Sequence, residues 1–329
     1  MKKLLIFLIS FIPTLLFCYE WQQIGTANCN INNYVCSIGG GETLCTDTGI
    51  IMSMGGTWIE HNLGLPVWGS IDGYPEDKIL IMGDGTDSDG IYMYNFCSGE
   101  LEVLEYFFKP HFIIILNGDI YVGGEDGLIK SNEGWEPVEF FNGFNCLAME
   151  YYEGETDYYV VTTSDDIFIS EDNGETWIQS SAGSPLISDM IFDNFGILWG
   201  IFPDHSNSSG LWKSSDFGYS WDIEYFSDAM SSVHITDEKV YVGWEEYFEG
   251  AEGVALWNQE EQQMQFMNDG LPNRNINKLS ENTNIYCSNL VCCTEEGAFI
   301  TTSLEVDVID DQIIKNEYWL SNYPNPFNP

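Results

Sequence analysis

A short apolar element recurs seven times along the chain. Each copy begins with Gly or Asp and continues with apolar residues: GIIMS from Gly49, GIYMY from Gly90, GLIKS from Gly127, DIFIS from Asp166, GLWKS from Gly210, GVALW from Gly253 and GAFIT from Gly297. The successive spacings are 41, 37, 39, 44, 43 and 44 residues. Self-similarity at such a period indicates a repeat architecture. The sequence therefore predicts seven near-equal structural units.

Three further apolar runs accompany this element in each unit. One precedes it, as in KILIMG from Lys78 or KVYVGW from Lys239, and another lies further upstream, as in FIIILN from Phe112. A fourth run follows it, as in TWIEHN from Thr57. The runs are rich in Val, Ile, Tyr, Phe and Trp and are separated by Gly, Asn, Asp or Pro, as expected for strands and hairpins. Each unit therefore predicts four antiparallel strands.

A four-stranded unit cannot bury both faces by itself, so neighbouring units must cover them. Radial packing does this and leaves only short edges. We therefore expect an all-β fold, a seven-bladed β-propeller of four-stranded antiparallel blades over residues 19–306. An open solenoid is the alternative, although β-helix coils are much shorter than these units. Two segments compete to complete the last blade and close the ring: EWQQIG from Glu20, which resembles the fourth runs, and LEVDVI from Leu304.

The N-terminus predicts export. Lys2 and Lys3 precede the apolar run LLIFLISFIPTLLF, so residues 1–18 read as a signal peptide. A single membrane anchor and a lipoprotein signal ending at Cys18 are the competing interpretations; Phe17 argues against the second, because a small residue normally precedes a lipidated Cys. We expect a mature chain without a membrane span, secreted or displayed on a bacterial cell surface.

Composition narrows the classes of partner. The chain has 52 acidic and 10 basic residues, a formal net charge of −42, which disfavours binding to nucleic acid or to anionic membranes. A large negative net charge keeps a protein soluble, and it also suits a surface that binds cations. Aromatic residues make up 15% of the chain, too many for a disordered acidic protein.

Eight cysteines follow residue 18: Cys29, Cys36, Cys45, Cys97, Cys146, Cys287, Cys292 and Cys293. An exported chain with an even count permits disulfides. Ring closure brings the first three near the last three, so a disulfide across the closure is one prediction, and buried free thiols are the other. The cysteines lack the spacing of a zinc site.

Two segments fit the Asp-box pattern S-x-D-x-G-x-[ST]-W at equivalent places in consecutive units. They are SEDNGETW at 170–177 and SSDFGYSW at 214–221. We expect the Asp to accept backbone N–H groups, the Gly to adopt a positive φ and the Trp to fill space between sheets. The predicted structural positions are Ser170, Asp172, Gly174, Thr176, Trp177, Ser214, Asp216, Gly218, Ser220 and Trp221.

With these motifs the chain resembles the Asp-box (BNR) repeat β-propellers, a group that includes sialidases, xyloglucan-degrading hydrolases, sortilin-like receptors and photosystem-assembly factors. The resemblance covers residues 20–306 and implies the fold more than any activity. A second resemblance lies in LSNYPNPFNP at 320–329, which looks like the start of a truncated C-terminal sorting domain of type IX or related secretion, after a linker at 307–319. It implies recognition of the tail by secretion machinery. A Pro-rich linker is the alternative for this tail.

Catalytic signals are weak, and we assign no catalytic residue. Sialidases need three arginines to grip a carboxylate, whereas this chain has only Arg274. The sequence contains no GxSxG, HExxH or P-loop pattern. Paired carboxylates of a glycosidase remain an alternative, because acidic residues are abundant.

Three long loops between second and third strands predict an acidic, partly aromatic rim on the face opposite the Asp-boxes. The candidate ligand-binding residues are Asp84, Asp87, Asp89, Asp204, His205, Glu245, Glu246, Tyr247, Phe248 and Glu249. Their oxygens are of the type that holds calcium, the one cofactor considered, and their aromatic rings suit a sugar or a protein partner. We therefore expect an exported, non-catalytic propeller that binds a protein or glycan. The alternatives are a carbohydrate-active enzyme and the extracellular sensor propeller of a longer receptor.

Overall fold

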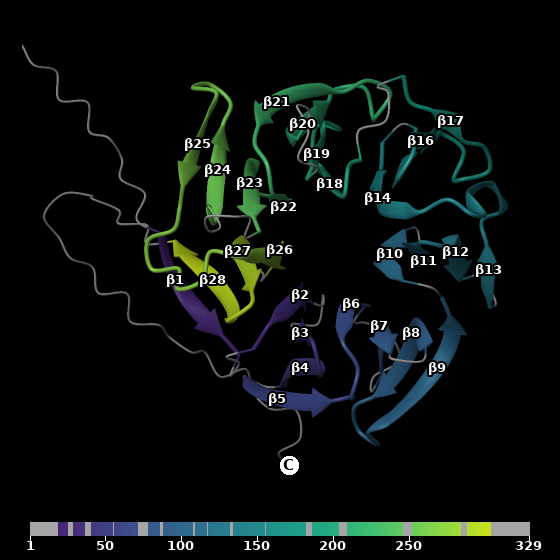
Figure 1. The fold of residues 1–329 in the computed structure, drawn as a ribbon, viewed down its shortest axis with the longest axis vertical. Coiled ribbons are helices and arrows are strands. Elements are labelled where there is room, and N and C mark those ends of the chain that lie inside the picture. Colours follow the sequence, from purple (N-terminus) through teal and green to yellow (C-terminus); the bar gives the residue numbers. More distant parts are fainter. Residues whose placement is uncertain are drawn as a thin grey trace, which may run out of the picture.

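A ring of seven four-stranded sheets makes up the structure, a computed structural model (Figure 1). It describes residues 19–25, 29–36, 41–54, 56–71, 78–85, 88–107, 109–116, 118–131, 134–154, 156–181, 186–203, 209–245, 252–283 and 288–303. The predicted signal peptide at 1–18, the linker at 307–319 and the tail at 320–329 lie outside these residues. Among the described residues, no helix has the length and apolar character needed to cross a membrane. The prediction of a seven-bladed all-β propeller is confirmed.

Each of the first three blades is an antiparallel meander whose strands follow chain order from the channel outward. Blade 1 contains β2 (Ile31–Cys36), β3 (Glu42–Thr46), β4 (Gly49–Met54) and β5 (Thr57–Asn62). Blade 2 contains β6 (Val67–Ile71), β7 (Lys78–Gly85), β8 (Ser88–Asn95) and β9 (Glu100–Tyr106). Blade 3 contains β10 (Pro110–Leu116), β11 (Asp119–Gly124), β12 (Gly127–Ser131) and β13 (Trp135–Pro137), followed by the 3-10 helix η1 (Glu139–Phe141).

The next three blades repeat this order. Blade 4 contains β14 (Cys146–Tyr152), β15 (Tyr158–Thr163), β16 (Ile167–Ser170) and β17 (Ile178–Gln179). Blade 5 contains β18 (Asp189–Phe192), β19 (Leu198–Phe202), β20 (Gly210–Ser214) and β21 (Asp222–Phe226). Blade 6 contains β22 (Met230–Thr236), β23 (Lys239–Trp244), β24 (Val254–Asn258) and β25 (Gln263–Phe266).

The last blade joins the two ends of the ring. It contains β26 (Ile276–Thr283), β27 (Ser288–Thr294) and β28 (Gly297–Ser303), and β1 (Tyr19–Ile24) is its outermost strand. β1 pairs antiparallel with β28 from Tyr19 opposite Ser303 to Ile24 opposite Ala298. Of the two segments predicted to compete for this place, EWQQIG occupies it. The segment LEVDVI lies outside the described residues.

Apolar packing lies between the blades. Seven core clusters of buried side chains occur, and each joins two neighbouring sheets. The second strand of a blade is covered on both faces, so β19 reads LWGIF and is buried throughout. Outer strands face solvent on one side, as the exposed and half-buried alternation of β9 shows. Burial of apolar surface between sheets is therefore what holds the ring together.

The two Asp-box hairpins have the same hydrogen bonds. Ser170 Oγ donates to Asp172 Oδ1 at 2.8 Å, and Asp172 accepts from the Thr176 backbone N–H at 2.8 Å and from its hydroxyl at 2.6 Å. The equivalent distances in the second hairpin, at Ser214, Asp216 and Ser220, are 2.8, 2.8 and 2.6 Å.

The glycines and tryptophans of these hairpins have distinct roles. Gly174 and Gly218 have φ of 84° and 96°, a conformation that favours glycine. Trp221 is buried in the core between blades 4 and 5, and Trp177 is half-buried against the core between blades 3 and 4. Each hairpin thus connects the third and fourth strands of its sheet, and its Trp packs between two sheets.

None of the described cysteines forms a disulfide: Cys29, Cys36, Cys45, Cys97, Cys146, Cys292 and Cys293. The predicted closure disulfide is therefore absent among them, and Cys287 lies outside the described residues. Cys292 and Cys293 are consecutive in β27, so their side chains point to opposite faces. Cys292 packs between blades 6 and 7, and Cys293 packs between blades 7 and 1. Both act as buried apolar side chains, in agreement with the alternative prediction of buried thiols.

Candidate ligand-binding site

One extra residue interrupts the inner strand of every blade near its start. In six blades the register with the second strand skips a single position: Asn32, Trp68, His111, Leu147, Ser231 and Asn277. In blade 5 the backbone N–H of Ser188 donates to the Ile201 carbonyl at 3.0 Å, although Asp189 is the paired partner of Ile201. Ser188 is thus the equivalent position. We call these seven residues the mouth ring.

A β-bulge places its extra residue outside the regular strand pairing and redirects the side chain. Here all seven mouth-ring residues line one cavity of about 360 Å3 in the channel. Other lining residues of this cavity form two different sides. The apolar side comes from blade 3 and consists of Phe112, Ile113 and Ile114. The charged side comes from blades 5 and 7 and includes Asp189 and Lys278. We call this space the channel cavity.

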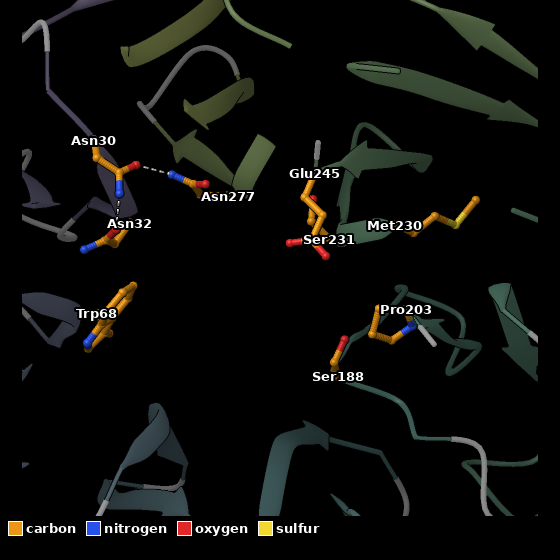
Figure 2. A pocket seen from close by; sticks show the side chains of 9 residues that line it. All are labelled: Asn30, Asn32, Trp68, Ser188, Pro203, Met230, Ser231, Glu245 and Asn277. Atoms are coloured by element: carbon orange, nitrogen blue, oxygen red, sulfur yellow. Dashed lines mark hydrogen bonds between the residues drawn. The ribbon is translucent and has the colours of Figure 1, made fainter. Parts of the chain in front are cut away.

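A second cavity of about 330 Å3 lies at the mouth and shares five residues of the mouth ring (Figure 2). We call it the mouth cavity. Its lining residues are Asn30, Asn32, Trp68, Ser188, Pro203, Met230, Ser231, Glu245 and Asn277. Trp68 lies across the opening from Ser188 and Pro203 (Figure 2). One large aromatic ring therefore faces amides, hydroxyls and a carboxylate.

A network of amides holds one side of the mouth cavity in place. Asn277 Nδ2 donates to Asn30 Oδ1 at 2.6 Å and to the Ile31 carbonyl at 2.9 Å. Asn32 Nδ2 donates to Asp47 Oδ1 at 3.2 Å and to the Val67 carbonyl at 3.0 Å. Both amide hydrogens of Asn277 are thereby used on the protein, so its carbonyl oxygen is the group left to accept a hydrogen bond from a ligand.

Two side chains of the mouth ring lack the surroundings that their chemistry favours. Trp68 is 43% exposed, although a Trp ring gains most by burial. Ser231 Oγ is buried and has no hydrogen-bond partner among the described residues. Most buried polar atoms are satisfied, so an orphaned hydroxyl in a cavity wall suggests a partner from outside the protein.

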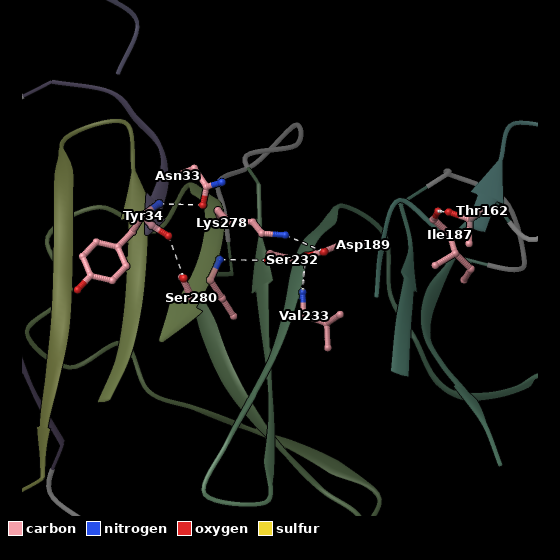
Figure 3. Close-up of polar contacts among 10 residues, drawn as sticks. Asn33, Tyr34, Thr162, Ile187, Asp189, Ser232, Val233, Lys278 and Ser280 are labelled. Atoms are coloured by element: carbon pink, nitrogen blue, oxygen red, sulfur yellow. Dashed lines mark hydrogen bonds and ion pairs between the residues drawn. The ribbon is translucent and has the colours of Figure 1, made fainter. Parts of the chain in front are cut away.

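An ion pair in the channel wall joins blades 5 and 7 over the inner strand of blade 6 (Figure 3). Lys278 Nζ lies 2.7 Å from Asp189 Oδ1, and Asp189 Oδ2 accepts from the Ser232 hydroxyl at 2.7 Å and the Val233 backbone N–H at 3.1 Å. Ser232 Oγ in turn accepts from the Leu279 backbone N–H at 3.0 Å. Both oxygens of Asp189 are therefore engaged by the protein, and the pair joins the inner strands of three blades.

Glu150 brings a second carboxyl group to the channel cavity. Burial and, to a smaller extent, the Asp189 carboxylate raise its pKa to about 8, although the backbone N–H of Tyr151 and the Lys278 ammonium act in the opposite direction. Desolvation and a like charge both disfavour the ionised form. The raised pKa favours the protonated form of the Glu150 carboxyl at neutral pH.

The predicted acidic rim is described only in part. Glu245 is exposed and lines the mouth cavity. Asp84 pairs with Asp89 at the ends of β7 and β8, and Asp89 Oδ2 accepts from the Lys109 backbone N–H at 3.1 Å. Asp87, Asp204, His205, Glu246, Tyr247, Phe248 and Glu249 lie outside the described residues, as does the side chain of Asp84.

Calcium binding stays a prediction. In the part of the chain that the structure describes, no three His, Cys, Asp or Glu side chains gather in an arrangement suited to a metal ion. Of the predicted residues, the structure places Glu245 at the mouth cavity, where it joins side chains that the sequence analysis did not single out.

The sequence analysis predicted neither the mouth ring nor the charged residues Glu150, Asp189 and Lys278 of the channel cavity. A signal was present: a pair of polar residues stands between two apolar residues at Asn32-Asn33, Ser188-Asp189, Ser231-Ser232 and Asn277-Lys278. Two consecutive polar residues break the period of two expected of a strand, which is how a bulge reads in a sequence. Trp68 gives no such signal, because Trp is a common strand residue.

Comparisons with solved structures support the fold. The extracellular domain of BT4673 from B. thetaiotaomicron, a proposed one-component system, matches with a TM-score of 0.67 at 10% identity over 86% of this chain and 39% of that chain. A catalytically inactive virginiamycin B lyase from Staphylococcus aureus with quinupristin matches with a TM-score of 0.64 at 10% identity over 87% and 99%. An ancestral GH74 enzyme matches with a TM-score of 0.55 at 12% identity over 73% and 37%.

At these identities the likeness extends to the fold alone. The chain spans about 40% of the length of the BT4673 domain. No protein-family model matches the sequence, and no curated protein matches it either.

Proposed function

We propose that this protein is an exported, non-catalytic propeller that binds a glycan at the mouth of its central channel. The observation that carries the proposal is the mouth cavity itself, in which the 43% exposed ring of Trp68 faces amide and hydroxyl side chains. The signal-like segment at 1–18 and the sorting-like tail at 320–329 support export.

The chemistry of the lining suits a sugar. One face of a pyranose ring carries C–H groups that pack on an aromatic ring, and its edge carries hydroxyls that donate and accept hydrogen bonds. The mouth cavity offers Trp68 for the face, the Asn277 carbonyl as acceptor and the orphaned Ser231 hydroxyl for the edge. The amide network holds these groups before binding, which lowers the entropic cost of association.

The carboxyl groups of the channel argue against hydrolysis. A glycosidase needs one protonated acid and one carboxylate free to act as base or nucleophile. Glu150 meets the first requirement, but both oxygens of Asp189 are hydrogen-bonded or ion-paired within the protein. Asp189 therefore serves structure, and the described lining of the channel cavity offers the glycosidase alternative no second carboxylate that is free to react.

The test is a glycan array followed by calorimetric titration of the strongest neutral hit. We expect Trp68→Ala to weaken binding at least tenfold. Tyr106→Ala, which removes a 67% exposed ring on the outer strand β9, is the matched control and should bind as the parent does. Equal losses in both variants, or no binding to any glycan, would overturn the proposal. Hydrolysis of a hit would instead favour the enzyme.

A sensor propeller is the second candidate. It draws support from the similarity to the BT4673 extracellular domain, whose name describes a signalling system. Ligand binding at the mouth is common to both candidates. Sequencing of the complete gene separates them, because a receptor requires a membrane-spanning segment and a cytoplasmic signalling domain on the same chain.

A further inference from the structure

The channel cavity has one more carboxyl group than it has cations. Its charged and titratable lining residues are Glu150, Asp189, Lys278 and His111. Lys278 is paired with Asp189 at 2.7 Å, and His111 Nε2 is hydrogen-bonded to Asn145 Oδ1 at 2.9 Å at the exposed rim. No ion pair to Glu150 is present among the described residues. Its carboxyl thus faces the cavity without a cation of its own.

A buried carboxyl in this position has two stable forms. It keeps its proton, or it ionises beside a cation that enters the cavity. The Asp189 carboxylate repels a carboxylate at Glu150, so an incoming cation meets two acidic groups and one lysine. The net charge of −42 also favours the approach of cations over anions.

The remaining lining restricts the kind of cation. Phe112, Ile113 and Ile114 form a side of the cavity whose side chains carry no oxygen to bind a metal ion, and the described residues contain no metal-ligand cluster. The cavity thus requires a positive charge next to Glu150 and an apolar surface next to blade 3. An ammonium group on a carbon skeleton provides both, because its charge faces the carboxyl and its skeleton faces the apolar side. Trp68 lines the same cavity as Glu150, so one ligand is able to contact both.

We infer that the glycan bound at this site is an amino sugar whose free ammonium group pairs with the Glu150 carboxylate in the channel. This inference rests on the proposed function and narrows it to one class of ligand. The Trp68 ring packs on the sugar, the Ser231 hydroxyl and the Asn277 carbonyl bind its hydroxyls, and Glu150 selects the charged amine over an acetamide or a hydroxyl. Binding below the pKa of Glu150 displaces its proton to solvent.

The experiment compares three tetramers of one size: β-linked glucosamine, N-acetylglucosamine and glucose. Each is titrated calorimetrically at pH 6.5 into the parent chain, Glu150→Gln, Trp68→Ala and the control Glu102→Gln. Glu102 is exposed on β9, so its variant makes the same change in net charge away from the channel. Titrations at 0.15 M and 0.5 M salt separate the site from general attraction to an acidic surface.

We expect the parent chain and Glu102→Gln to bind the glucosamine tetramer at least tenfold more tightly than the other two. Glu150→Gln should remove this preference and keep the weaker neutral affinity. Titration in two buffers with different ionisation enthalpies should show that the parent releases more protons on binding than Glu150→Gln does, because only the parent gives up the Glu150 proton. Binding of all three tetramers with equal affinity, or a preference that survives in Glu150→Gln, would overturn the amino-sugar inference alone. Absence of binding to every tetramer and array glycan would overturn the proposed function as well.

Discussion

The indole N–H of Trp21 donates a hydrogen bond of 2.6 Å to the carbonyl oxygen of Met267, across 246 residues of chain. Trp21 lies on β1, and Met267 follows the last strand of blade 6. The side chain is buried and packs with Leu271 and Phe299 between the last two blades. One residue thus combines strand pairing, apolar contact and a polar bond at the point where the ring closes.

Substitution of Trp21 should lower the free energy of unfolding in two steps. Trp21→Phe keeps an aromatic ring and loses the hydrogen bond to Met267, so we expect a loss of about 1–2 kcal/mol. Trp21→Ala also leaves a cavity, and we expect a loss of about 3–5 kcal/mol. Urea unfolding followed by Trp fluorescence and circular dichroism measures both. Equal stability of Trp21→Ala and the parent would mean that closure depends on the backbone pairing alone.

We expect the second Asp-box, through the carboxylate of Asp216, to stabilise the folded protein less at acidic pH than at neutral pH. Burial raises the pKa of Asp216, but hydrogen bonds from Ser220 and Ser214 outweigh burial and the net pKa lies below the ordinary 3.8. A lowered folded-state pKa contributes stability that is fully present above the ordinary value and is lost as the pH falls through the folded-state pKa. Asp216→Asn should therefore cost about 1–3 kcal/mol at pH 7. The difference from the parent should shrink steadily below pH 3.8.

Unfolding curves at pH 7, 4, 3 and 2.5 provide the measurement. Asp222→Asn, at an exposed position on the neighbouring strand β21, is the control and should change stability little at any pH. A difference between Asp216→Asn and the parent that is constant across this range would show that the carboxylate charge is not what stabilises the hairpin.

The contribution of Glu150 to the free energy of unfolding should depend on pH in the opposite direction to that of Asp216. Its pKa is raised to about 8 from the ordinary 4.5 by burial and by the Asp189 carboxylate, so the folded chain holds this proton more tightly than the unfolded chain. Its contribution to stability is full below pH 4.5 and is lost as the pH rises to about 8. Glu150→Gln cannot ionise, so its stability relative to the parent should increase between pH 5 and 8 and level off above.

Urea unfolding at pH 5, 7 and 9 without ligand measures this relative stability. Glu102→Gln provides the baseline for the loss of one exposed carboxylate, and its difference from the parent should not vary over this range. If the stability of Glu150→Gln relative to the parent does not change with pH, then Glu150 has its ordinary pKa. The argument that its carboxyl attracts a cation into the channel cavity would then fail.

The cysteines predict a graded reaction with thiol reagents. Cys97 is exposed, whereas Cys45, Cys146, Cys292 and Cys293 are buried. Burial also raises the pKa of Cys45 and of Cys146 to about 12, which suppresses the reactive thiolate. We expect rapid labelling of Cys97 in the native protein and labelling of the four buried thiols only in denaturant, each located by peptide mass mapping. Discovery of a disulfide at any of these five residues would contradict the structure.

The blade pattern was predictable because it depends on local repetition. The elements beginning at Gly49, Gly127 and Gly210 became the third strands β4, β12 and β20, and the other copies hold the same place in their blades. Gly210 shows why the position favours glycine: its φ is 144°, and a Cβ there would collide with the carbonyl oxygen of Tyr225. Periodicity and turn chemistry of this kind are legible in a single sequence.

The site was less predictable, because it depends on residues from different blades that meet only in the closed ring. Glu150 and Asp189 are one blade apart, and Lys278 is a further 89 residues from Asp189. No short motif connects them. The rim prediction selected long loops by their acidity, whereas the described mouth is built from single bulged residues in short strands, of which Trp68 has no local signal at all.

The mouth ring separates the part of each blade that recognises a ligand from the part that maintains the fold. A bulged residue takes no place in the strand register, so a change of its side chain leaves the register and the interblade core as they are. Asn32 and Asn277 are also held by hydrogen bonds to the Val67 and Ile31 carbonyls, so bulges such as Trp68 and Leu147 are the positions whose substitution would yield different mouths on one scaffold. Selection is thus free to change specificity by point mutation at the bulges, without the insertions and loop exchanges by which other scaffolds acquire new ligands.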